Sequence, residues 1–514
     1  MDQSVAVRDL TSFTSWNAAW SELRVAVLGL GATGFSAADT LTELKADVLV
    51  IADAASENRI EMAQVIGATL ALGGSPEAQV AALAAHTPDV VIVSPGYPLD
   101  HALLTWCREN NVALWTEIEL AWRLRDKTGT PAEWIAVTGT NGKTTTAQLT
   151  AHILTTAGFR AGAVGNIGIP VLDAIRYPDG FDFLVVELSS FQLHGMPRDG
   201  VGAISPLASV CLNFADDHLD WHGSRDAYAA AKATVYANTK VAAVYNRAVV
   251  ETQAMVEDAD VIEGCRAIGF GLDTPGPSDF GIVSDILADR AFGDDRHNAA
   301  LELFTLDELR QRHLAAPHMV ANILAASALV RAAGVSVEAL RAGVASFEID
   351  AHRNQVVLVS GGVTWINDSK ATNSHAASAS LSAADPVVWI VGGLLKGVDV
   401  APLVAKHAPR IKAAIVIGND RLTIRAAFER HAPQIPVFEV DATDTKHVMP
   451  RAVEMAHGIA SEGDTVLLAP AAASMDQFSS YSDRGEKFAA AVLERVGGND
   501  DGASSATTTA PTVD

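Results

Sequence analysis

The segment WIAVTGTNGKTTT, which runs from Trp134 to Thr146, constrains the fold of this chain more than any other segment. Its apolar start predicts a buried parallel strand, and the residues after it predict a helix. Between them lie glycines followed by Lys143 and Thr144. Backbone N–H groups of such a loop, together with the positive end of the helix, favour a bound phosphate. The lysine can reach terminal phosphates and the threonine hydroxyl can ligate Mg²⁺, so we predict a nucleotide phosphate site.

The loop departs from the usual G-x-x-x-x-G-K-[ST] pattern. That pattern needs a glycine at position 137, which is Val137, and the spacing here is the shorter one from Gly139 to Gly142. The alternative interpretation is a glycine-rich turn with an incidental lysine. We favour the phosphate loop because strand, loop and helix fall where the mechanism needs them.

Composition limits the classes of protein that the chain can belong to. Its 514 residues predict about three domains. Hydrophobic residues make up 49% of the chain and charged residues only 19%, so it can form several hydrophobic cores. A formal net charge of −24 argues against nucleic acid as the main partner. We expect no membrane insertion, because no apolar run approaches the ~18 residues needed and no signal pattern begins the chain. Three well-separated cysteines favour reduced thiols in a cytoplasmic protein.

A second glycine motif lies near the N-terminus. The predicted strand 24–28 leads directly into GLGATG, which fits G-x-G-x-x-G, and a second strand, 48–51, ends near Asp53. An acid about 20 residues beyond the glycines binds ribose in dinucleotide folds. The motif predicts a nucleotide-like ligand, and the alternative is a domain whose glycines only pack a helix on a strand. A third strand, 90–93, leads into the loop SPGYP at Ser94.

The middle of the chain holds acids, a histidine and a lysine after further predicted strands. A buried strand, 181–186, ends at Glu187, which is placed to hold Mg²⁺ rather than to lie in solvent. His218 and His222 have the spacing of a zinc pair, but they lack H-E-x-x-H and a third ligand, so we predict no zinc. Lys232 lies among alanines, where an ammonium group is poorly solvated. The alternative is an ordinary helix lysine whose long side chain extends to reach solvent. Residues 271–313 predict a hairpin insertion.

The last third repeats the pattern of a strand followed by polar residues. Strands are predicted at 363–366, 387–391 and 465–468, and they lead into NDSKATN, GGLLKG and APAAASMDQF. Ligands bind at this carboxyl edge in open α/β sheets. Residues beyond about 497 are of low complexity and predict disorder.

Taken in order, these motifs resemble the Mur ligases of peptidoglycan synthesis over about residues 20–490. The resemblance rests on GLGATGFS, SPGYPLD, TGTNGKTTT, GNIGIP, ELSSFQL, DDHLDWHG, YAAAKATVY, HR, INDSKATN, GGLLKG and APAAASMDQF. It implies three α/β domains: an N-terminal Rossmann-like UDP-binding domain, a central P-loop-type ATPase with a parallel sheet and a C-terminal Rossmann-like amino-acid-binding domain. Their expected bounds are 1–123, 124–349 and 350–495, with a disordered tail at 496–514.

The resemblance also implies a role for individual residues. The catalytic set would be Lys143, Glu187, His218 and Lys232, and two Mg²⁺ ions would be held by Thr144, Glu187, His218 and a CO₂-derived carbamate on Lys232. ATP would contact Gly139, Thr140, Asn141, Gly142, Lys143, Thr144, Thr145, Asn322, Arg353, Asp368 and Lys370. The UDP substrate would contact Gly31, Thr33, Asp53, Ser94, Asn166, Ser189 and Gln192. D-glutamate would contact Thr372, Lys396, Ser474 and Tyr481.

Within the family, the N-terminal motif and ELSSFQL are most similar to the member that adds D-glutamate to UDP-N-acetylmuramoyl-L-alanine. The implied activity is ATP-dependent amide formation through an acyl phosphate, by a cytoplasmic monomer. Four positions depart from the expected pattern: Met319 weakens the adenine assignment, while Tyr481 and the pair Leu394-Leu395 bear on amino-acid selectivity.

Other functions remain open. A relative in the same superfamily could add another amino acid or could add glutamate to a folate, although a folate enzyme would not need a UDP-binding domain. A nicotinamide-dependent oxidoreductase built on GLGATG and Asp53 would leave the phosphate loop, Glu187 and the last third unexplained. A non-catalytic ATP-binding scaffold is disfavoured by the intact Lys143, Glu187, His218 and Lys232.

Overall fold

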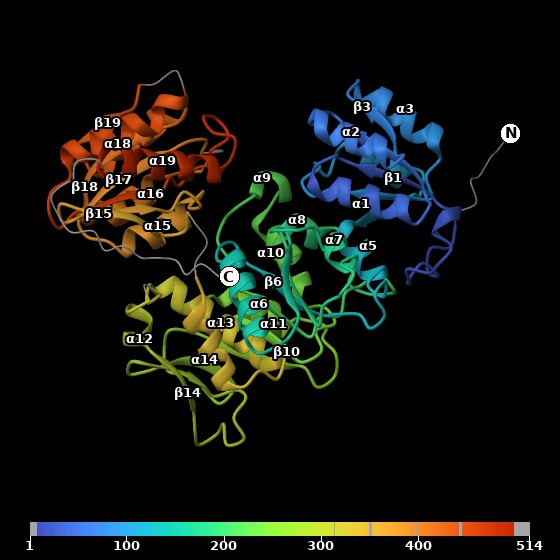
Figure 1. Cartoon of the computed structure of the whole chain (residues 1–514), viewed down its shortest axis with the longest axis horizontal. Helices are drawn as coiled ribbons and strands as arrows, with labels where there is room; N and C mark the ends of the chain where they lie inside the picture. The colour runs from blue at the N-terminus through green and yellow to red at the C-terminus, as the bar shows by residue number, and fades with distance from the viewer. Residues whose placement is uncertain (1–7, 313, 349–351, 396–397, 442–444, 498–514) are drawn as a thin grey trace, which may run out of the picture. The chain divides into compact units, whose positions relative to one another are not determined.

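The computed structural model describes residues 8–312, 314–348, 352–395, 398–441 and 445–497. The chain divides into two compact units, residues 1–347 and 348–514. The first unit contains two sheets and the second contains one, each with helices packed against it (Figure 1). The predicted α/β class with three sheets is confirmed. The exact domain bounds expected from the sequence stay a prediction.

The N-terminal sheet is fully parallel and has the strand order β3-β2-β1-β4-β5. Its central strand reads VAVL after Arg24, and these four residues are completely buried. Burial on both faces explains why the strand is uniformly apolar rather than alternating. The elements are β1 (Arg24–Leu28), α1 (Ala32–Glu43), β2 (Asp47–Ala52), α2 (Glu57–Val65), β3 (Thr69–Leu72), α3 (Pro76–His86), β4 (Val90–Val93), α4 (Ala102–Glu109) and β5 (Ala113–Thr116).

The second sheet is larger and mixed, with the order β14-β13-β12-β11-β10-β9-β6-β8-β7. Strands β6 to β12 pair in parallel, whereas β12, β13 and β14 pair antiparallel. The hairpin predicted at 271–313 is therefore present and extends the sheet, which is only partly parallel. The strands are β6 (Glu133–Thr138), β7 (Ala161–Gly165), β8 (Phe183–Glu187), β9 (Ala208–Cys211), β10 (Ala242–Asn246), β11 (Arg266–Phe270), β12 (Asp279–Val283), β13 (Ile286–Asp289) and β14 (Leu301–Thr305).

The helices of this part lie in the connections between strands. The phosphate-loop helix α6 packs against both α13 and α14. The helices are α6 (Lys143–Thr156), α7 (Val171–Ile175), α8 (Ser190–His194), α9 (Leu219–His222), α10 (Arg225–Ala233), α11 (Val250–Glu257), α12 (Leu306–Arg310), α13 (Pro317–Ala332) and α14 (Val337–Ser346).

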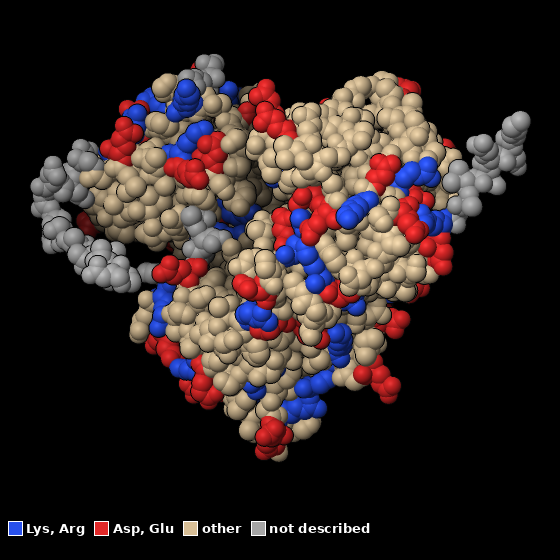
Figure 2. All heavy atoms as spheres, turned by 45° about the vertical axis from the view of Figure 1, so that its right-hand side comes forward, with Lys and Arg blue, Asp and Glu red and all other residues tan. Residues whose placement is uncertain are grey.

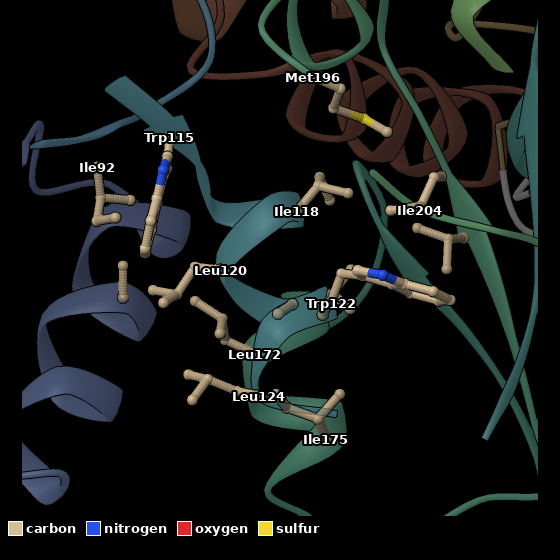
Figure 3. Close-up of a cluster of buried hydrophobic side chains, with 14 of the residues drawn as sticks. Ile92, Trp115, Ile118, Leu120, Trp122, Leu124, Leu172, Ile175, Met196 and Ile204 are labelled. Carbon is tan, nitrogen blue, oxygen red and sulfur yellow. The ribbon is translucent and has the colours of Figure 1, made fainter. Parts of the chain in front are cut away.

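A single buried helix joins the two sheets of the first unit. Every residue of α5 (Glu117–Arg123) is buried, including its charged ends. Its apolar side chains share one core with residues of α7 and of both sheets (Figure 3). Trp122 of α5 packs edge-on against Trp134 of β6, with ring centroids 5.1 Å apart. The N-terminal and central parts are thus packed together across the boundary predicted at residue 123.

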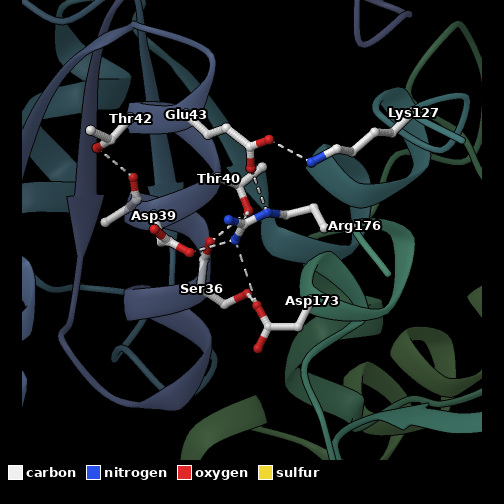
Figure 4. A network of polar contacts seen from close by, with 9 residues as sticks. Ser36, Asp39, Thr40, Thr42, Glu43, Lys127, Asp173 and Arg176 are labelled. Atoms are coloured by element: carbon white, nitrogen blue, oxygen red, sulfur yellow. Dashed lines mark hydrogen bonds and ion pairs between the residues drawn. The ribbon is translucent and has the colours of Figure 1, made fainter. Parts of the chain in front are cut away.

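A polar network supports the same contact at its edge (Figure 4). Arg176, just after α7, donates to Asp39 at 2.6 Å and to Glu43 at 2.9 Å, both on α1. Ser36 donates to Asp173 at 2.5 Å, and Lys127 pairs with Glu43. The basic partners Arg176 and Lys127 are largely buried, with 19% and 21% side-chain exposure, so their attraction is screened less than that of fully exposed pairs.

The second unit is built on a sheet of order β15-β16-β20-β17-β18-β19, in which only the β15–β16 pair is antiparallel. Separate apolar clusters cover its two faces. The elements are β15 (Gln355–Ser360), β16 (Val363–Asn367), α15 (Ser374–Ser382), β17 (Val387–Gly392), α16 (Ala401–His407), β18 (Ile411–Ile417), α17 (Arg421–His431), β19 (Val437–Glu439), α18 (Val448–Ile459), β20 (Thr465–Leu468) and α19 (Tyr481–Arg495).

Two further expectations concern the chain as a whole. From residue 498 onward the predicted disordered tail lies outside the described residues. Among the described residues, no helix combines the length and apolar character that crossing a membrane requires. Acidic and basic side chains are interspersed on the face shown in Figure 2.

The network at Arg176 should contribute measurably to the stability of the first unit. We expect Arg176→Ala to lower the free energy of unfolding by about 1–2 kcal/mol, because two charge-assisted hydrogen bonds are lost and screening by solvent is incomplete. Urea unfolding followed by tryptophan fluorescence measures this change. The control is Arg160→Ala, whose ion pair with Asp182 is more exposed and should leave the midpoint unchanged. Equal midpoints for the two variants would contradict the prediction.

Candidate active site

The phosphate loop follows β6 and requires glycine at two positions. Gly142 has a φ of 82°, and a Cβ built on it would lie 2.6 Å from Oδ1 of Asn322. Gly139 has a φ of 151°, and its Cβ would lie 3.0 Å from the Cβ of Leu212. Both positions combine a left-handed backbone with a close neighbour, so a side chain at either would move the loop.

The segment after β9 holds the loop in place. Asn213 accepts from the backbone N–H of Asn141 at 2.8 Å and donates back to the Asn141 carbonyl at 3.0 Å. The Thr140 hydroxyl donates to the Ala215 carbonyl at 3.2 Å and accepts from the Ala215 N–H at 3.0 Å. These reciprocal bonds tie the loop to the segment that follows β9.

Two lysines converge on one carbonyl of the loop. Lys143 donates to the carbonyls of Gly139 and Thr140, each at 2.9 Å, and Lys232 donates to the same Gly139 carbonyl at 2.9 Å. Burial, together with the charge of Lys143, lowers the pKa of Lys232 to about 7. Like charges this close favour a bound anion or loss of a proton. Two ammonium groups at one carbonyl oxygen fit a loop that binds an anion.

A buried carboxylate lies beside the loop. Glu187 ends β8, where it pairs in register with Val137 of β6. Its Oε1 accepts from the Asn166 amide at 3.1 Å, while Oε2 is buried and has no hydrogen-bond partner among the described residues. Glu187 contributes to the electrostatic environment of Lys232, which places the two groups in one region. An unpartnered buried carboxylate oxygen fits a cation ligand.

The donor set resembles that of an incomplete magnesium site. Within the part of the chain that the structure describes, no three His, Cys, Asp or Glu side chains are grouped to hold a metal. Mg²⁺ usually takes only one or two protein carboxylates and completes its shell with water and phosphate oxygens. Glu187 and Thr144, which lies in the first turn of α6, fit such a site.

His218 occupies a strained position next to this region. Its φ is 52°, unusual for a residue other than glycine. Its Nε2 lies 3.5 Å from Oδ2 of Asp217, and its ring packs edge-on against Phe191 with centroids 4.7 Å apart. Asp217 also acts on the pKa of Lys232, so the backbone at 217–218 borders the lysine pair. Asn322, in α13, lies against Gly142, and Thr145 is buried in α6.

The residues predicted to touch the UDP substrate form two groups. Gly31, Thr33, Asp53 and Ser94 follow the adjacent strands β1, β2 and β4 at one sheet edge. A Cβ at Gly34 would lie 2.0 Å from the Gly29 carbonyl oxygen, so the turn there requires glycine. Asp53 accepts from Gln79 at 2.7 Å.

The second group lies on the central sheet. Ser189 caps α8 and forms a capping box with Gln192. Gln192 accepts from the Ser189 N–H at 2.8 Å and donates to the Glu117 carboxylate at 2.6 Å. Its amide is therefore engaged within the protein. Asn166 also donates from its backbone N–H to the Glu187 carbonyl at 2.9 Å.

The second unit assembles its own cluster at the carboxyl ends of β16 and β20. The Lys370 ammonium lies 3.8 Å from the ring centroid of Tyr481, the first residue of α19. Burial raises the pKa of Asp368 to about 6, although Ser380 donates to its carboxylate. The charges of Lys370 and Arg353 lower the pKa of Tyr481 against the effect of burial. Ser474 is buried after β20, and Thr372 lies in the loop before α15.

One predicted residue cannot be placed, and several supporting residues were not predicted. Lys396 lies outside the described residues. Arg484 is fully buried and donates to the carbonyls of Ser369 at 2.8 Å and Ala472 at 3.1 Å, and nothing in the sequence marked it. The Lys232 ammonium lies 4.8 Å from the ring centroid of Tyr228. The two residues are four apart on one helix, and this spacing could have indicated the contact.

Comparisons with known proteins agree with this arrangement. Residues 137–330 match the family model described as Mur ligase middle domain. Residues 352–472 match the model described as Mur ligase, glutamate ligase domain. These matches cover the phosphate loop, Glu187 and Lys232 in the first unit, and Asp368 and Lys370 in the second.

Relatives and solved structures extend the likeness to nearly the whole chain. UDP-N-acetylmuramoylalanine–D-glutamate ligase of Leifsonia xyli is 59% identical over 97% of this chain and 97% of its own length. The enzyme of the same name from Streptomyces avermitilis is 49% identical over 92% of this chain and 98% of its own length. The fold is similar to that of UDP-N-acetylmuramate-alanine ligase MurC from Thermotoga maritima, at 17% identity and a TM-score of 0.56 over 93% of this chain and 100% of that one. The chain belongs to the Mur ligase family.

Proposed function

We propose that this chain is an ATP-dependent ligase that adds D-glutamate to UDP-N-acetylmuramoyl-L-alanine in peptidoglycan precursor synthesis. The observation that carries the proposal is the convergence of Lys143 and Lys232 on the Gly139 carbonyl, beside the buried Glu187. The relatives named for this reaction support the choice of substrates. A cytoplasmic location and a monomeric state stay part of the proposal.

The phosphate loop would activate the substrate carboxylate. A carboxylate does not condense with an amine in water, because its oxygen is a poor leaving group. In the proposed reaction a carboxylate oxygen of the L-alanyl group attacks the γ-phosphorus of ATP, ADP leaves, and an acyl phosphate forms. The amine of D-glutamate then attacks the acyl carbon, and phosphate departs with that oxygen. Lys143 and the loop N–H groups would hold the transferring phosphoryl group and offset its charge.

The chain also offers ligands for magnesium. Thr144 and Glu187 would hold one ion, and His218 with a carbamate on Lys232 would hold a second. Bound Mg²⁺ supplies charge neutralisation on the transferring phosphoryl group. Asn166 would orient Glu187 through the bond to Oε1, which leaves Oε2 for the ion.

The environment of Lys232 supports carbamate formation. Only a neutral amine reacts with CO₂, and a pKa of about 7 leaves much of Lys232 neutral near physiological pH. The carbamate would replace the buried positive charge by a negative one opposite Lys143. This exchange would relieve the like-charge contact at Gly139 and create an oxygen ligand at the same point.

The second unit would supply the amino-acid end of the reaction. We assign D-glutamate to Thr372, Lys396, Ser474 and Tyr481, and part of the ATP contact to Arg353, Asp368 and Lys370. The contact of Lys370 with the Tyr481 ring supports a shared role for these two residues. The N-terminal residues Gly31, Thr33, Asp53 and Ser94, with Asn166, Ser189 and Gln192, would bind the UDP substrate.

Loss of the loop lysine should slow phosphoryl transfer. We expect Lys143→Met to lower kcat by about 10²–10³-fold, because a positive charge held at the developing negative charge is removed. The measurement is phosphate release from ATP with UDP-N-acetylmuramoyl-L-alanine and D-glutamate. Lys240→Met, which removes a lysine paired with Glu133 at a more exposed site, should leave the rate unchanged. A Lys143→Met enzyme as active as this control would contradict the proposal.

The carbamate should form as the pH rises. We expect a ¹³C signal from labelled CO₂ on the protein to grow between pH 6 and pH 8. The reason is that Lys232 loses its proton as the pH passes its value of about 7. Nuclear magnetic resonance measures the signal, and Lys232→Ala should abolish it while Lys240→Ala retains it. Short carboxylic acids should partly restore turnover to Lys232→Ala. A signal that persists in Lys232→Ala would remove the assignment.

The identity of the amino acid is testable directly. We expect phosphate release to depend on D-glutamate when amino acids are supplied one at a time, including L-glutamate, L-alanine and diamino acids. A higher rate with one of these others would point to another ligase of the superfamily. Binding of NAD(H) in place of the UDP substrate would favour the oxidoreductase alternative.

A further inference from the structure

Trp221 contacts two parts of the first unit that lie far apart in the sequence. It belongs to the short helix α9, which begins directly after His218. Its indole Nε1 donates to the backbone carbonyl of Tyr97 at 3.0 Å, across 124 residues of sequence. Tyr97 lies in the loop that follows β4 of the N-terminal sheet. The side chain therefore joins this loop to the segment that follows β9 of the central sheet.

The loop after β4 packs against the glycine turn that follows β1. Gly29, in this turn, has a φ of 94°, and a Cβ built on it would lie 2.9 Å from the Ser94 hydroxyl oxygen and 3.6 Å from the Tyr97 ring. Because the two segments are in close contact, a shift of the loop would change the shape of the turn. Both segments were assigned to the UDP substrate. The bond from Trp221 to Tyr97 thus holds one wall of that proposed site.

The other side of Trp221 borders His218. The Trp221 ring lies edge-on to Phe191 with centroids 4.7 Å apart, and Phe191 lies edge-on to His218, also at 4.7 Å. Edge-to-face contacts of this kind favour one orientation of each ring. The backbone N–H of Trp221 also donates to the His218 carbonyl at 3.2 Å. Trp221 therefore acts on His218 through the Phe191 ring and through the backbone.

The segment that carries His218 has few side chains turned toward the protein. Of the four residues of α9, Leu219 and Asp220 are exposed, whereas Trp221 is half-buried and His222 is buried. His218 itself adopts a φ of 52°, which a residue other than glycine keeps where its surroundings impose it. Its side chain retains 41% exposure. The position of His218 thus depends on how α9 is anchored.

We propose that Trp221 is a positioning residue of the ligase, which holds the loop after β4 and His218 in register, so that the UDP-substrate site and the second magnesium site are aligned. This inference rests on the proposed function, because it takes Ser94 and His218 as ligand contacts. It goes further by assigning the alignment of two sites to one side chain. Trp221 acts through the Tyr97 carbonyl and the Phe191 ring, and not on a reacting atom.

The simpler interpretation is that Trp221 only adds to the hydrophobic core. The buried helix α5 already joins the two sheets of this unit, and neither Phe191 nor Trp221 belongs to the core around it. A residue that serves packing alone would change stability and leave ligand affinity as it is. A positioning residue would change the affinity of the site that it aligns, so the two roles give different measurements.

The bond to Tyr97 is tested by calorimetric titration of the full-length protein with UDP-N-acetylmuramoyl-L-alanine, without nucleotide or metal. Trp221→Phe keeps an aromatic ring and removes the N–H donor. We expect the dissociation constant to rise about fivefold, because one neutral hydrogen bond that fixes the binding loop is lost. The matched control is Trp20→Phe, which removes an indole bond of 2.9 Å to the Ser15 carbonyl and should stay within twofold of the wild type. An unchanged constant in Trp221→Phe would overturn the inference.

The contact with His218 is tested by nuclear magnetic resonance of protein that carries ¹³C-labelled histidine. The His218 resonance is assigned by its loss in His218→Asn. Trp221→Ala removes the ring that packs on Phe191, so we expect the imidazole shift of His218 to move at least halfway toward that of free histidine. The control Trp16→Ala, which removes another half-buried indole of this unit, should leave the shift unchanged. An unmoved His218 resonance in Trp221→Ala would also overturn the inference.

The melting temperature and the rate of phosphate release separate the remaining outcomes. In Trp221→Ala the Mg²⁺ concentration for half-maximal phosphate release should rise at least threefold, while KM for D-glutamate stays within twofold. A lower melting temperature as the only change would give Trp221 a structural role and overturn the inference. Absence of phosphate release from the wild-type protein would contradict the proposed ligase function, whereas an active wild type whose Trp221 variants match their controls would overturn this inference alone.

Discussion

The meeting of two lysines at the Gly139 carbonyl is the constraint on which the rest of the site depends. Lys143 and Lys232 each donate to this one oxygen at 2.9 Å. The buried ammonium of Lys232 cannot be screened by water, so its pKa falls. Folding therefore brings two ammonium groups to one loop of an acidic chain. Nucleotide phosphates, together with a carbamate on Lys232, would place negative charge beside them.

Elements far apart in sequence hold the loop. Asn213, after β9, bonds Asn141 in both directions, and Asn322 of α13 lies against Gly142. These segments pack together in one arrangement of sheet and helices. The fold therefore sets the positions of the two lysines at the loop. Electrostatic stabilisation of phosphoryl transfer depends on such preorganisation.

Much of this arrangement was predictable from the sequence, for identifiable reasons. Strands such as β1 and β6 are uniformly apolar and are followed by glycine motifs, so their ends and their ligand edge could be located. The antiparallel extension at β12–β14 was predicted as a hairpin but not as part of the main sheet, since pairing between distant strands leaves no local pattern. The burial of helix α5 could not be predicted from a local pattern. Its complete burial depends on two sheets meeting around it.

The supporting contacts were the least predictable part. Buried Arg484 bonds Ser369, which lies 115 residues away in the sequence, and buried Glu117 bonds Gln192, which lies 75 residues away. No periodicity marks them, because their roles depend on tertiary packing alone. The assignments of Lys143, Glu187, His218 and Lys232 came from strand ends and family motifs, and their individual roles stay predictions.

The most direct test of the central claim is the fate of the carboxylate oxygen. UDP-N-acetylmuramoyl-L-alanine labelled with ¹⁸O in its alanyl carboxylate would be turned over with ATP and D-glutamate, and the released phosphate analysed by mass spectrometry. Activation of the carboxylate at the phosphate loop predicts one ¹⁸O atom in each phosphate from a fully labelled carboxylate. Phosphate without ¹⁸O would show that ATP is cleaved without forming an acyl phosphate, and it would contradict the account.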